Sequence, residues 1–404
     1  MTATAARPEN AVTAWRSPAA TYYLLVASTT ILVLVGLAVV LSSSSVASIR
    51  AGSSNAYGLF LTQLMALTAG LAAMVVGSRL PVMFWKRAAP WLLFSSVVLL
   101  LVVLTHGITV GGNQAWIRIG GFSFQPSEAA KLGLALYLGV VLSTFRKRLT
   151  NLKHVMLPGG IVAIGVIGLV LAGRDMGTAM VMLVLVAVAF WVAGVPARFF
   201  GIFGAFAATG IVVLLNSGTT RMARLTQWAS GSCDDVDACW QQTHGTWALA
   251  SGGLWGLGPG MSREKWGYLP AADNDYIFAI IGEEFGLIGT LLVLAAYAMM
   301  IIAITRIVTR ATDRFVQISG AAIGAWIVVQ ACINIAVVLE LAPVTGVPLP
   351  LVSSGGSSLI MSLAALGVLM SFARSEPGAA EAFAARPSVV RRSLAVLSRG
   401  RRRG

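Results

Sequence analysis

The sequence predicts an all-α polytopic membrane protein with about ten transmembrane helices and a large extracytoplasmic loop between spans 7 and 8. Hydrophobic residues make up 57% of the 404 positions, whereas charged residues make up only 11%. A soluble domain carries about 25% charged residues, so a large soluble core does not account for this composition. The mean hydropathy of +0.82 supports the same conclusion, and apolar runs long enough to cross a bilayer recur along the chain.

Ten apolar runs define the predicted spans. They cover residues 21–43, 57–77, 90–108, 126–145, 156–173, 176–194, 199–216, 275–305, 316–342 and 356–373. Residues 1–20 are expected to form a short disordered cytoplasmic arm without a cleavable signal peptide, because the first apolar run is too long for one. Residues 374–404 form a basic cytoplasmic tail that is expected to lie on anionic lipid or to hold a partner. The membrane domain is therefore predicted over 21–373.

The basic residues predict the orientation of these spans. With the N-terminus in the cytoplasm, most of the 29 Lys and Arg residues fall on the cytoplasmic side. The inverted topology would reverse that ratio, so both termini are predicted to be cytoplasmic. The net charge of +14 thus reflects topology and contact with anionic headgroups, and nucleic acid is not an expected partner.

Three long loops fall on the opposite face, at residues 109–125, 217–274 and 344–355. Irregular backbone at membrane depth is tolerated only where it lines a cavity or is covered by protein. We therefore expect an outward-facing cavity and an extracytoplasmic active surface.

Acidic residues gather where the large loop enters span 8. Asp273 and Asp275 stand at the entrance, and Glu283 and Glu284 follow inside the apolar run. A carboxylate within the hydrocarbon costs about 2–3 kcal/mol unless it faces water or protein. The two aspartates are therefore candidate functional residues, and the two glutamates are predicted to form an intramembrane polar network.

The segment that opens span 4 reads QPSEAAK over 125–131. Pro126 suits the first turn of a helix, and a carboxylate in that turn, Glu128, favours the positive helix end. Lys131 lies on the same helix face as Glu128, so a local salt bridge is one interpretation. Because Lys131 lies below the helix mouth, an acid of span 8, Glu283 or Glu284, is the alternative partner.

Arg174 and Asp175 form a tight outer turn between spans 5 and 6. The simpler interpretation of Asp175 is an N-cap of the helix that begins at Met176. A role in a site is the alternative.

The large loop carries several candidate features. Cys233 and Cys239 are separated by five residues, and a local disulfide between them is plausible on an oxidising face. The glycine-rich stretch 252–260 permits close approach of a ligand or of a neighbouring helix. Arg263 and Lys265 follow and are candidate cations for an anionic ligand.

The last outer loop ends in the run Ser353-Ser-Gly-Gly-Ser-Ser358, directly before span 10. Hydroxyl and amide donors at a helix start suit an anion, with Ser353, Ser354 and Ser357 as candidates. A re-entrant turn whose serines satisfy their own backbone is equally consistent with the sequence. The three histidines show no metal-ligand spacing, so no resident metal site is predicted.

Four of these segments together resemble the SEDS family. They are QPSEAAK at 125–131, RDMGTA at 174–179, the glycine-rich and acidic block at 252–289, and PVTGVPLPLVSSGGSS at 343–358. The resemblance covers essentially the whole chain after Thr21. The wording REKWGYLPAAD and SSGGSS is similar to the actinobacterial cell-division branch of the family rather than to its rod-elongation branch. Its members are peptidoglycan glycosyltransferases that polymerise lipid II, which places such a chain at the division septum.

The resemblance also implies roles for residues. The catalytic aspartate of the family matches Asp275, and its motif glutamate and lysine match Glu128 and Lys131. The aspartate of its Pro-Asp-x-Gly-Thr motif matches Asp175, although Arg174 stands where proline is usual.

One departure concerns the candidate phosphate contact. The family often has Arg-Arg-Trp before the Gln-Pro-Ser-Glu motif, whereas this chain has Gln114-Ala115-Trp116. Arg118, two residues further on, is the remaining arginine that could contact phosphate there.

The implied reaction is an inverting single displacement. Asp275 is expected to take the proton of a sugar 4-hydroxyl as general base. Positive charge is needed where the diphosphate departs, and the candidates are Arg118, Lys131, Arg263 and Lys265. A divalent cation, Mg or Mn, could assist them.

Two rival functions are weighed against the enzyme. A flippase for the same lipid would use Glu283, Glu284, Lys131 and Glu340 as a polar pathway, but the polar loops are concentrated on one face. A pure scaffold for division proteins would not require buried charges. As an enzyme, the chain is expected to partner a class B penicillin-binding protein, other divisome proteins and membrane lipids.

Overall fold

The computed structural model describes residues 17–384 apart from 51, 53–54, 111, 121, 146–150, 152, 154–155 and most of 202–235. The long helices are α2 (Pro18–Arg50), α3 (Gly58–Arg79), α4 (Val82–His106), α5 (Pro126–Thr144), α8 (Met176–Ala193), α12 (Ile277–Arg310), α13 (Arg314–Val338) and α14 (Gly356–Arg374). Shorter elements are the π-helical turn η2 (Met156–Gly160), α7 (Ile161–Ala172), α11 (Val236–Gly252), the 3-10 turn η3 (Glu264–Trp266) and α15 (Ala379–Ala384).

Helices occupy most of each predicted span that the structure describes, but α4 ends at His106 and α13 at Val338, before the predicted ends at 108 and 342. Seven helices of the described chain are long and apolar enough to cross a membrane, namely α2, α3, α4, α8, α12, α13 and α14. The predicted span 199–216 lies largely outside the described residues, so the total of ten spans stays a prediction. The chain is a mostly helical membrane protein.

The third span begins earlier than predicted, because α4 starts at Val82 and carries Pro90 inside the helix. Lys86 and Arg87 suggested a loop there. In the structure the Lys86 amine instead lies 2.6 Å from a carboxylate oxygen of Asp313, the N-cap residue of α13. A charged residue near a helix end is readily accommodated when it has such a partner.

A small sheet in the outer loop 109–125 departs from the all-α prediction. Strands β1 (Ile108–Val110), β2 (Asn113–Ile119) and β3 (Phe122–Phe124) pair antiparallel in the order β1-β2-β3. The alternation of apolar and polar residues in β2, followed by a two-glycine turn, is typical of a hairpin. The sequence therefore contains a hairpin signal in the loop 109–125, which the all-α prediction did not include.

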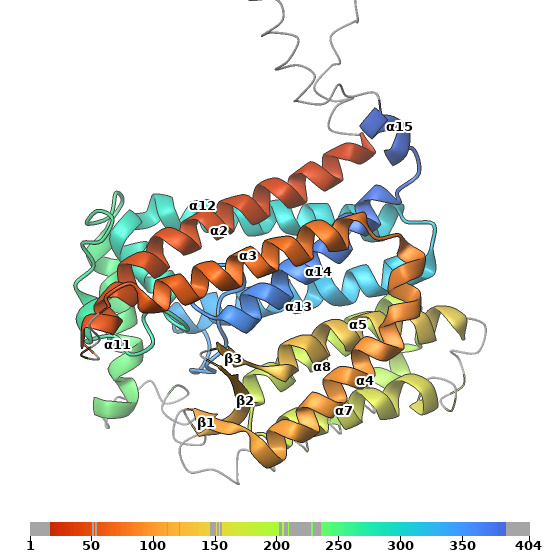
Figure 1. Cartoon of the computed structure of the whole chain (residues 1–404), viewed down its shortest axis with the longest axis horizontal. Helices are drawn as coiled ribbons and strands as arrows, with labels where there is room; N and C mark the ends of the chain where they lie inside the picture. Colours follow the sequence, from red (N-terminus) through yellow and green to blue (C-terminus); the bar gives the residue numbers. More distant parts are fainter. Residues whose placement is uncertain are drawn as a thin grey trace, which may run out of the picture.

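Both ends of the described chain lie at the same end of the helices. The Tyr22 ring at the start of α2 meets the Phe383 ring of α15 at 5.4 Å, edge to face, and α15 lies beside the start of α2 (Figure 1). We call this the terminal end. The opposite end, where β1–β3, α11 and the start of α12 gather, is the loop end.

Helix α13 joins the two parts of the bundle. It contacts α5 and α8 on one side and α12 and α14 on the other. Figure 1 shows α2 running beside α12 and α3 beside α14, with α4, α5, α7 and α8 grouped on the other side of α13. Residues of α5 and α8 thereby come close to the outer loops that precede α12 and α14.

Helix α12 is broken near the loop end by the glycine-rich stretch before it. Gly286 adopts φ 65° and ψ −161°, outside the helical region. The amides of Leu257 and Gly258 donate to the carbonyls of Glu283 and Glu284, at 2.9 and 3.0 Å. Below the break, the Leu287 amide donates to Gly253. The close approach permitted by the glycines is therefore used for a neighbouring helix.

Gly256 tests this arrangement. It has φ 80°, and a side chain there would overlap the backbone of Glu284. We expect Gly256→Ala to lower the free energy of unfolding by more than about 1 kcal/mol, because the conformation and the space both exclude Cβ. Thermal unfolding of the detergent-solubilised protein measures the change.

Gly165→Ala in α7 is the matched control, because nothing lies within 4 Å of a Cβ built there. Alanine should be neutral or stabilise that helix, by up to about 1 kcal/mol. Equal stability of the Gly256 variant and the parent would contradict the proposed fit of the loop into the break.

Candidate active site

A polar cavity of about 100 Å³ opens at the loop end between α5, α8, α13 and the outer loops. Its lining residues are Asn113, Ala115, Trp116, Gln125, Glu128, Lys131, Asp175, Thr178, Val181, Asn274, Gln330, Gly346, Val347, Pro348, Ser354, Gly355 and Ser358. They come from six separate stretches of the chain, including four segments singled out in the sequence. The expected outer cavity is therefore present among the described residues.

Lys131 lies at the base of this cavity and is almost fully buried. Its amine lies 2.7 Å from Glu128 Oε1 and 2.9 Å from Gln330 Oε1, and it stands 4.7 Å from the centre of the Trp326 ring. The local salt bridge is therefore the correct interpretation. The alternative pairing with Glu283 or Glu284 is wrong, since both acids bind other groups.

Asp175 caps α8, as the simpler interpretation predicted, and its role in a site stays a prediction. One carboxylate oxygen accepts the Thr178 amide at 3.0 Å, so the residue caps α8. The other accepts the side-chain amide of Gln125 at 2.8 Å. Asp175 also lines the cavity. The two hydrogen bonds therefore hold its carboxylate in place near Lys131, which lines the same cavity.

Asp275 lies at the rim of the cavity, two residues before α12 begins at Ile277. Its neighbour Asn274 lines the cavity, and so does Gly346. A Cβ built on Gly346 would lie 3.5 Å from Asp275 Oδ2. Asp275 is half-buried and one of its carboxylate oxygens is inaccessible. Asp275 does not itself line the cavity, but the structure places it beside Asn274 and Gly346, which do.

Two side-chain amides of α13, those of Asn334 and Gln330, position Asp275 and Lys131 relative to each other. The Asn334 amide donates to the carbonyls of Asp275 and Val347, at 2.7 and 2.8 Å. One helical turn away, the Gln330 amide donates to the carbonyl of Pro348 at 3.1 Å, while its oxygen accepts from Lys131. Val347 and Pro348 are neighbours in the loop before α14. Through these two amides, the loop is therefore bonded to the same helix that contacts Asp275 and Lys131.

The serine run before α14 is held mainly by backbone. Ser353 Oγ accepts the Leu349 amide at 2.8 Å and donates to the carbonyl of Asn274 at 2.7 Å. The Ser354 amide donates to Asp273 O at 2.9 Å. Ser353 therefore satisfies backbone, as the re-entrant alternative required, whereas Ser354 and the first turn of α14 line the cavity. Ser357 is buried, and its hydroxyl has no hydrogen-bond partner among the described residues.

Asp273 stands beside the same serines. Its burial raises the pKa of the carboxyl above the ordinary value of 3.8, while hydrogen bonds from its own backbone and from Ser354 oppose that shift. Loss of solvent penalises the charged form of a carboxyl. Asp273 therefore holds its proton to higher pH than an exposed aspartate.

The remaining predicted cations do not line the cavity. Arg118 is exposed on β2, two residues from Trp116, so the alternation of a strand places both on one face. Arg263 is also exposed, and its backbone amide donates to Glu283. Cys233 and the side chain of Cys239 lie outside the described residues, so their disulfide stays a prediction.

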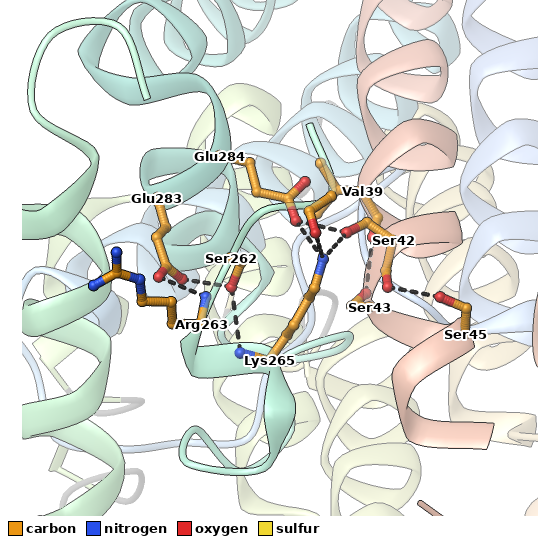
Figure 2. A network of polar contacts seen from close by, with 10 residues as sticks. Val39, Ser42, Ser43, Ser45, Ser262, Arg263, Lys265, Glu283 and Glu284 are labelled. Carbon is orange, nitrogen blue, oxygen red and sulfur yellow. Dashed lines mark hydrogen bonds and ion pairs between the residues drawn. The ribbon is translucent and has the colours of Figure 1, made fainter. Parts of the chain in front are cut away.

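Lys265 and the two glutamates form a separate buried network. The Lys265 amine lies 3.0 Å from Glu284 Oε1 and 2.6 Å from the hydroxyl of Ser42 on α2. Glu283 accepts the Ser262 hydroxyl and the Arg263 amide. Figure 2 shows Lys265 reaching between Glu284 and Ser42, with the Arg263 side chain directed away from them. Lys265 is thus committed to an ion pair outside the cavity.

The separation of this network from the terminal end follows from the length of α2. From Thr21 to Ser42 this continuous helix rises by about 32 Å. Thr21 bonds to Glu376, which also lies 3.8 Å from Arg310. The hydrocarbon of a bilayer is about 30 Å thick, which is close to this separation of the two polar groups. Glu283 and Glu284 do form a polar network, and its depth in the membrane stays a prediction.

Several residues of the site were not singled out from the sequence. They are Gln63, Gln125, Trp326, Gln330 and Asn334. Polar amides within apolar spans were the available signal for Gln63, Gln330 and Asn334.

His244 was also missed. It lies 2.6 Å from Glu264, with the Trp240 and Trp247 rings around it. The contact between His244 and Glu264 depends on tertiary packing, because the two residues are twenty positions apart in the sequence.

These features define a helical membrane protein with a polar, charged site at one surface of the bilayer. Residues 22–377 match the family of cell cycle proteins that comprises FtsW, RodA and SpoVE. The chain belongs to this family, which confirms the resemblance to the SEDS proteins.

The relatives carry related names. The chain is 35% identical over 383 residues to the probable peptidoglycan glycosyltransferase FtsW of Mycobacterium tuberculosis, covering 94% of this chain and 73% of that protein. It is 34% identical over 354 residues to the stage V sporulation protein E of Bacillus subtilis, covering 87% and 96%.

Solved structures agree with this relationship. A peptidoglycan synthase complex that coordinates polymerisation and crosslinking contains a chain with a TM-score of 0.70 and 28% identity, covering 87% of this chain and 96% of that one. The rod shape determining protein RodA of Thermus thermophilus has a TM-score of 0.63 and 25% identity, with the same coverage.

Asn334 offers a first test of the site. We expect Asn334→Leu to increase hydrogen exchange of the amides in 271–276 and 344–355, because two buried carbonyls lose their donor, at a cost of about 1–3 kcal/mol. Gln317→Leu, which removes an amide donor from the terminal end of the same helix, is the control and should leave those segments unchanged. Unchanged exchange in the Asn334 variant would contradict this account of how the loops are held.

The Lys265–Glu284 pair offers a second test. Lys265→Met leaves the Glu284 charge buried without its partner, and we expect a loss of about 3–5 kcal/mol of unfolding free energy. Lys265→Met combined with Glu284→Met should be markedly more stable than the sum of the single changes predicts. A double-mutant cycle on thermal or denaturant unfolding measures this coupling, and strict additivity would contradict it.

Proposed function

We propose that this chain is a peptidoglycan glycosyltransferase that polymerises lipid II into glycan strands at the extracytoplasmic membrane face during cell division. The observation that carries the proposal is the shared cavity of Lys131, Glu128 and Asp175, with Asp275 at its rim. The names of the relatives support the same activity. The two ends of the described chain lie at one end of the bundle, which agrees with the proposed topology of cytoplasmic termini.

The proposed reaction is a single displacement that inverts the anomeric carbon. The Asp275 carboxylate takes the proton of the acceptor sugar hydroxyl while that oxygen attacks the anomeric carbon of the donor. The bond from this carbon to the diphosphate oxygen breaks, and the lipid diphosphate leaves. A positioned general base contributes about 10²–10⁴-fold to such a step. The half-buried position of Asp275 beside a water-accessible cavity suits this role.

Positive charge for the leaving diphosphate is proposed to come from Lys131, assisted by the exposed Arg118, which shares a face of β2 with the cavity-lining Trp116. Lys131 is already oriented by Glu128 and Gln330, so its charge needs no rearrangement when the diphosphate forms. The first turn of α14, beside Ser354 and Ser358, offers backbone amides at a positive helix end. Arg263 and Lys265 lie outside the cavity and are not assigned to the diphosphate.

A divalent cation such as Mg or Mn would bind most readily at Glu128. One Glu128 oxygen pairs with Lys131, and the other is buried without a hydrogen-bond partner in the structure. Magnesium is commonly held by one or two carboxylates together with substrate phosphates. Such an ion would supply further positive charge to the diphosphate, while the described residues contain no group of three or more metal-binding side chains.

A class B penicillin-binding protein is the proposed partner, with other divisome proteins at the septum. Glycan strands require crosslinking after polymerisation, and the similar peptidoglycan synthase complex coordinates both activities. A flippase for the same lipid is the alternative. Its proposed polar pathway is weakened by the closed pairs of Glu283 and Glu284 with Ser262 and Lys265, which leave both acids little freedom to face a substrate.

Asp275→Asn tests the proposed general base. With purified protein and labelled lipid II, we expect the polymerisation rate to fall by about 10²–10⁴-fold, because the amide cannot accept the proton. Asp313→Asn, at the cap of α13 on the terminal end, is the control and should polymerise at close to the parental rate. Parental activity of the Asp275 variant would refute the base. Lipid movement across vesicles without any polymer from the parent would favour the flippase.

A further inference from the structure

The loop that fills the break in α12 exposes large apolar side chains. We call residues 253–261 the break loop. Trp255 is 80% exposed, and Leu254 and Met261 are 63% and 64% exposed. The loop carries no charged residue. An exposed tryptophan flanked by aliphatic side chains needs an apolar or half-apolar environment.

The depth of the break loop is fixed by its backbone. Its carbonyls at Gly253 and Leu254 accept the amides of Leu287 and Ile288, directly below the break. Its amides at Leu257 and Gly258 donate directly above the break. The loop therefore lies at the level of Gly286 and cannot move along α12 without losing these bonds.

That level is one of two polar levels whose separation along α2 is close to the thickness of the hydrocarbon. Gly286 is two residues from Glu284, which with Ser42 and Lys265 forms the polar group about 30 Å from the one at the terminal end. The residues of α12 just below the break are apolar and exposed. They are Leu287, Ile288, Leu291 and Leu292, each 45–52% exposed. The exposed surface of the break loop thus continues a surface that faces lipid.

We propose that the break loop is an interfacial anchor, with Trp255 seated among the headgroups and upper acyl chains of the leaflet at the loop end. Tryptophan is enriched at this level of membrane proteins because its ring is apolar and its N–H is polar. Trp266 and Tyr268, both more than half exposed, lie within 13 residues of Trp255 in sequence and extend the aromatic character of this region. Lipid is the committed occupant, since the patch is continuous with the lipid-facing side of α12.

The anchor has a consequence for the neighbouring segments. The break loop runs directly into Ser262 and Lys265, which bind Glu283 and Glu284. Lipid contact at Trp255 therefore fixes the depth of the network of Lys265, Glu283 and Glu284. It thereby also fixes the depth of the first turns of α12, which follow Asp275. This inference does not depend on the proposed glycosyl transfer.

A nitroxide probe at position 255 tests the anchor. Trp255→Cys is made in a chain whose three native cysteines are replaced by serine, labelled, and reconstituted into phosphatidylethanolamine and phosphatidylglycerol vesicles. Power saturation then compares collisions with oxygen, which partitions into lipid, and with a water-soluble nickel complex. We expect the oxygen-to-nickel ratio at 255 to exceed that at a water-side control by several-fold.

The controls are chosen from the same structure. Asn55→Cys, exposed in the loop beyond α2, reports water, and Ile288→Cys reports lipid. Met261→Cys is a second probe of the break loop, in case the Trp255 variant does not reconstitute. A nickel-dominated signal equal to that at 55 would overturn the proposal. Exclusion of both reagents at 255, persisting on dilution with lipid, would also overturn it, because a protein would then cover the loop.

Discussion

The structure depends on how α12 satisfies its backbone where it is broken at Gly286. Unpaired amides and carbonyls at a bilayer boundary are costly, so a break is tolerated only when another segment supplies partners. The break loop does so on both sides of Gly286. Glycines at 252 and 256 allow the approach, since side chains there would overlap α12. The glycine-rich sequence and the broken helix are thus one feature of the fold.

The break also explains how an acid comes to the cavity rim. Above Gly286, the first turns of α12 from Ile277 to Glu284 are buried. The covering protein is α11 and the loops, held by Asn334 and by Ser353. Asp275 is therefore placed by a protein-enclosed helix start and by the hydrogen bond that its backbone carbonyl accepts from Asn334.

The fold was largely predictable because membrane spans leave a strong signal over many residues. The predicted start of the third span was too late, because the charge of Lys86 is accommodated by a distant partner, Asp313. The small sheet was not predicted because its strands are short. At the site, Glu128, Lys131, Asp175 and Asp275 were selected from sequence, largely through the motifs they occupy. The Lys131–Glu128 pair was predictable from its spacing on one helix, but the distant partners of the buried charges were not: Lys131 also binds Gln330, and Lys265 binds Glu284, across 199 and 19 residues. Only tertiary packing decides such pairs.

The distribution of paired charges distinguishes a site from a scaffold. Beside the break in α12, Lys265 and Glu284 neutralise each other, and Ser42 and Gly260 O complete the bonds of the amine. Such a closed pair can hold helices together but offers nothing to a ligand. At the cavity, Glu128 has a buried oxygen with no hydrogen bond to any described residue, and Lys131 and Asp175 both line open space. A buried acceptor left without a hydrogen bond costs free energy, and a ligand that supplies a donor or a cation there recovers that cost. The cavity is therefore where binding energy is available, and the Lys265 network is where structural stability is generated.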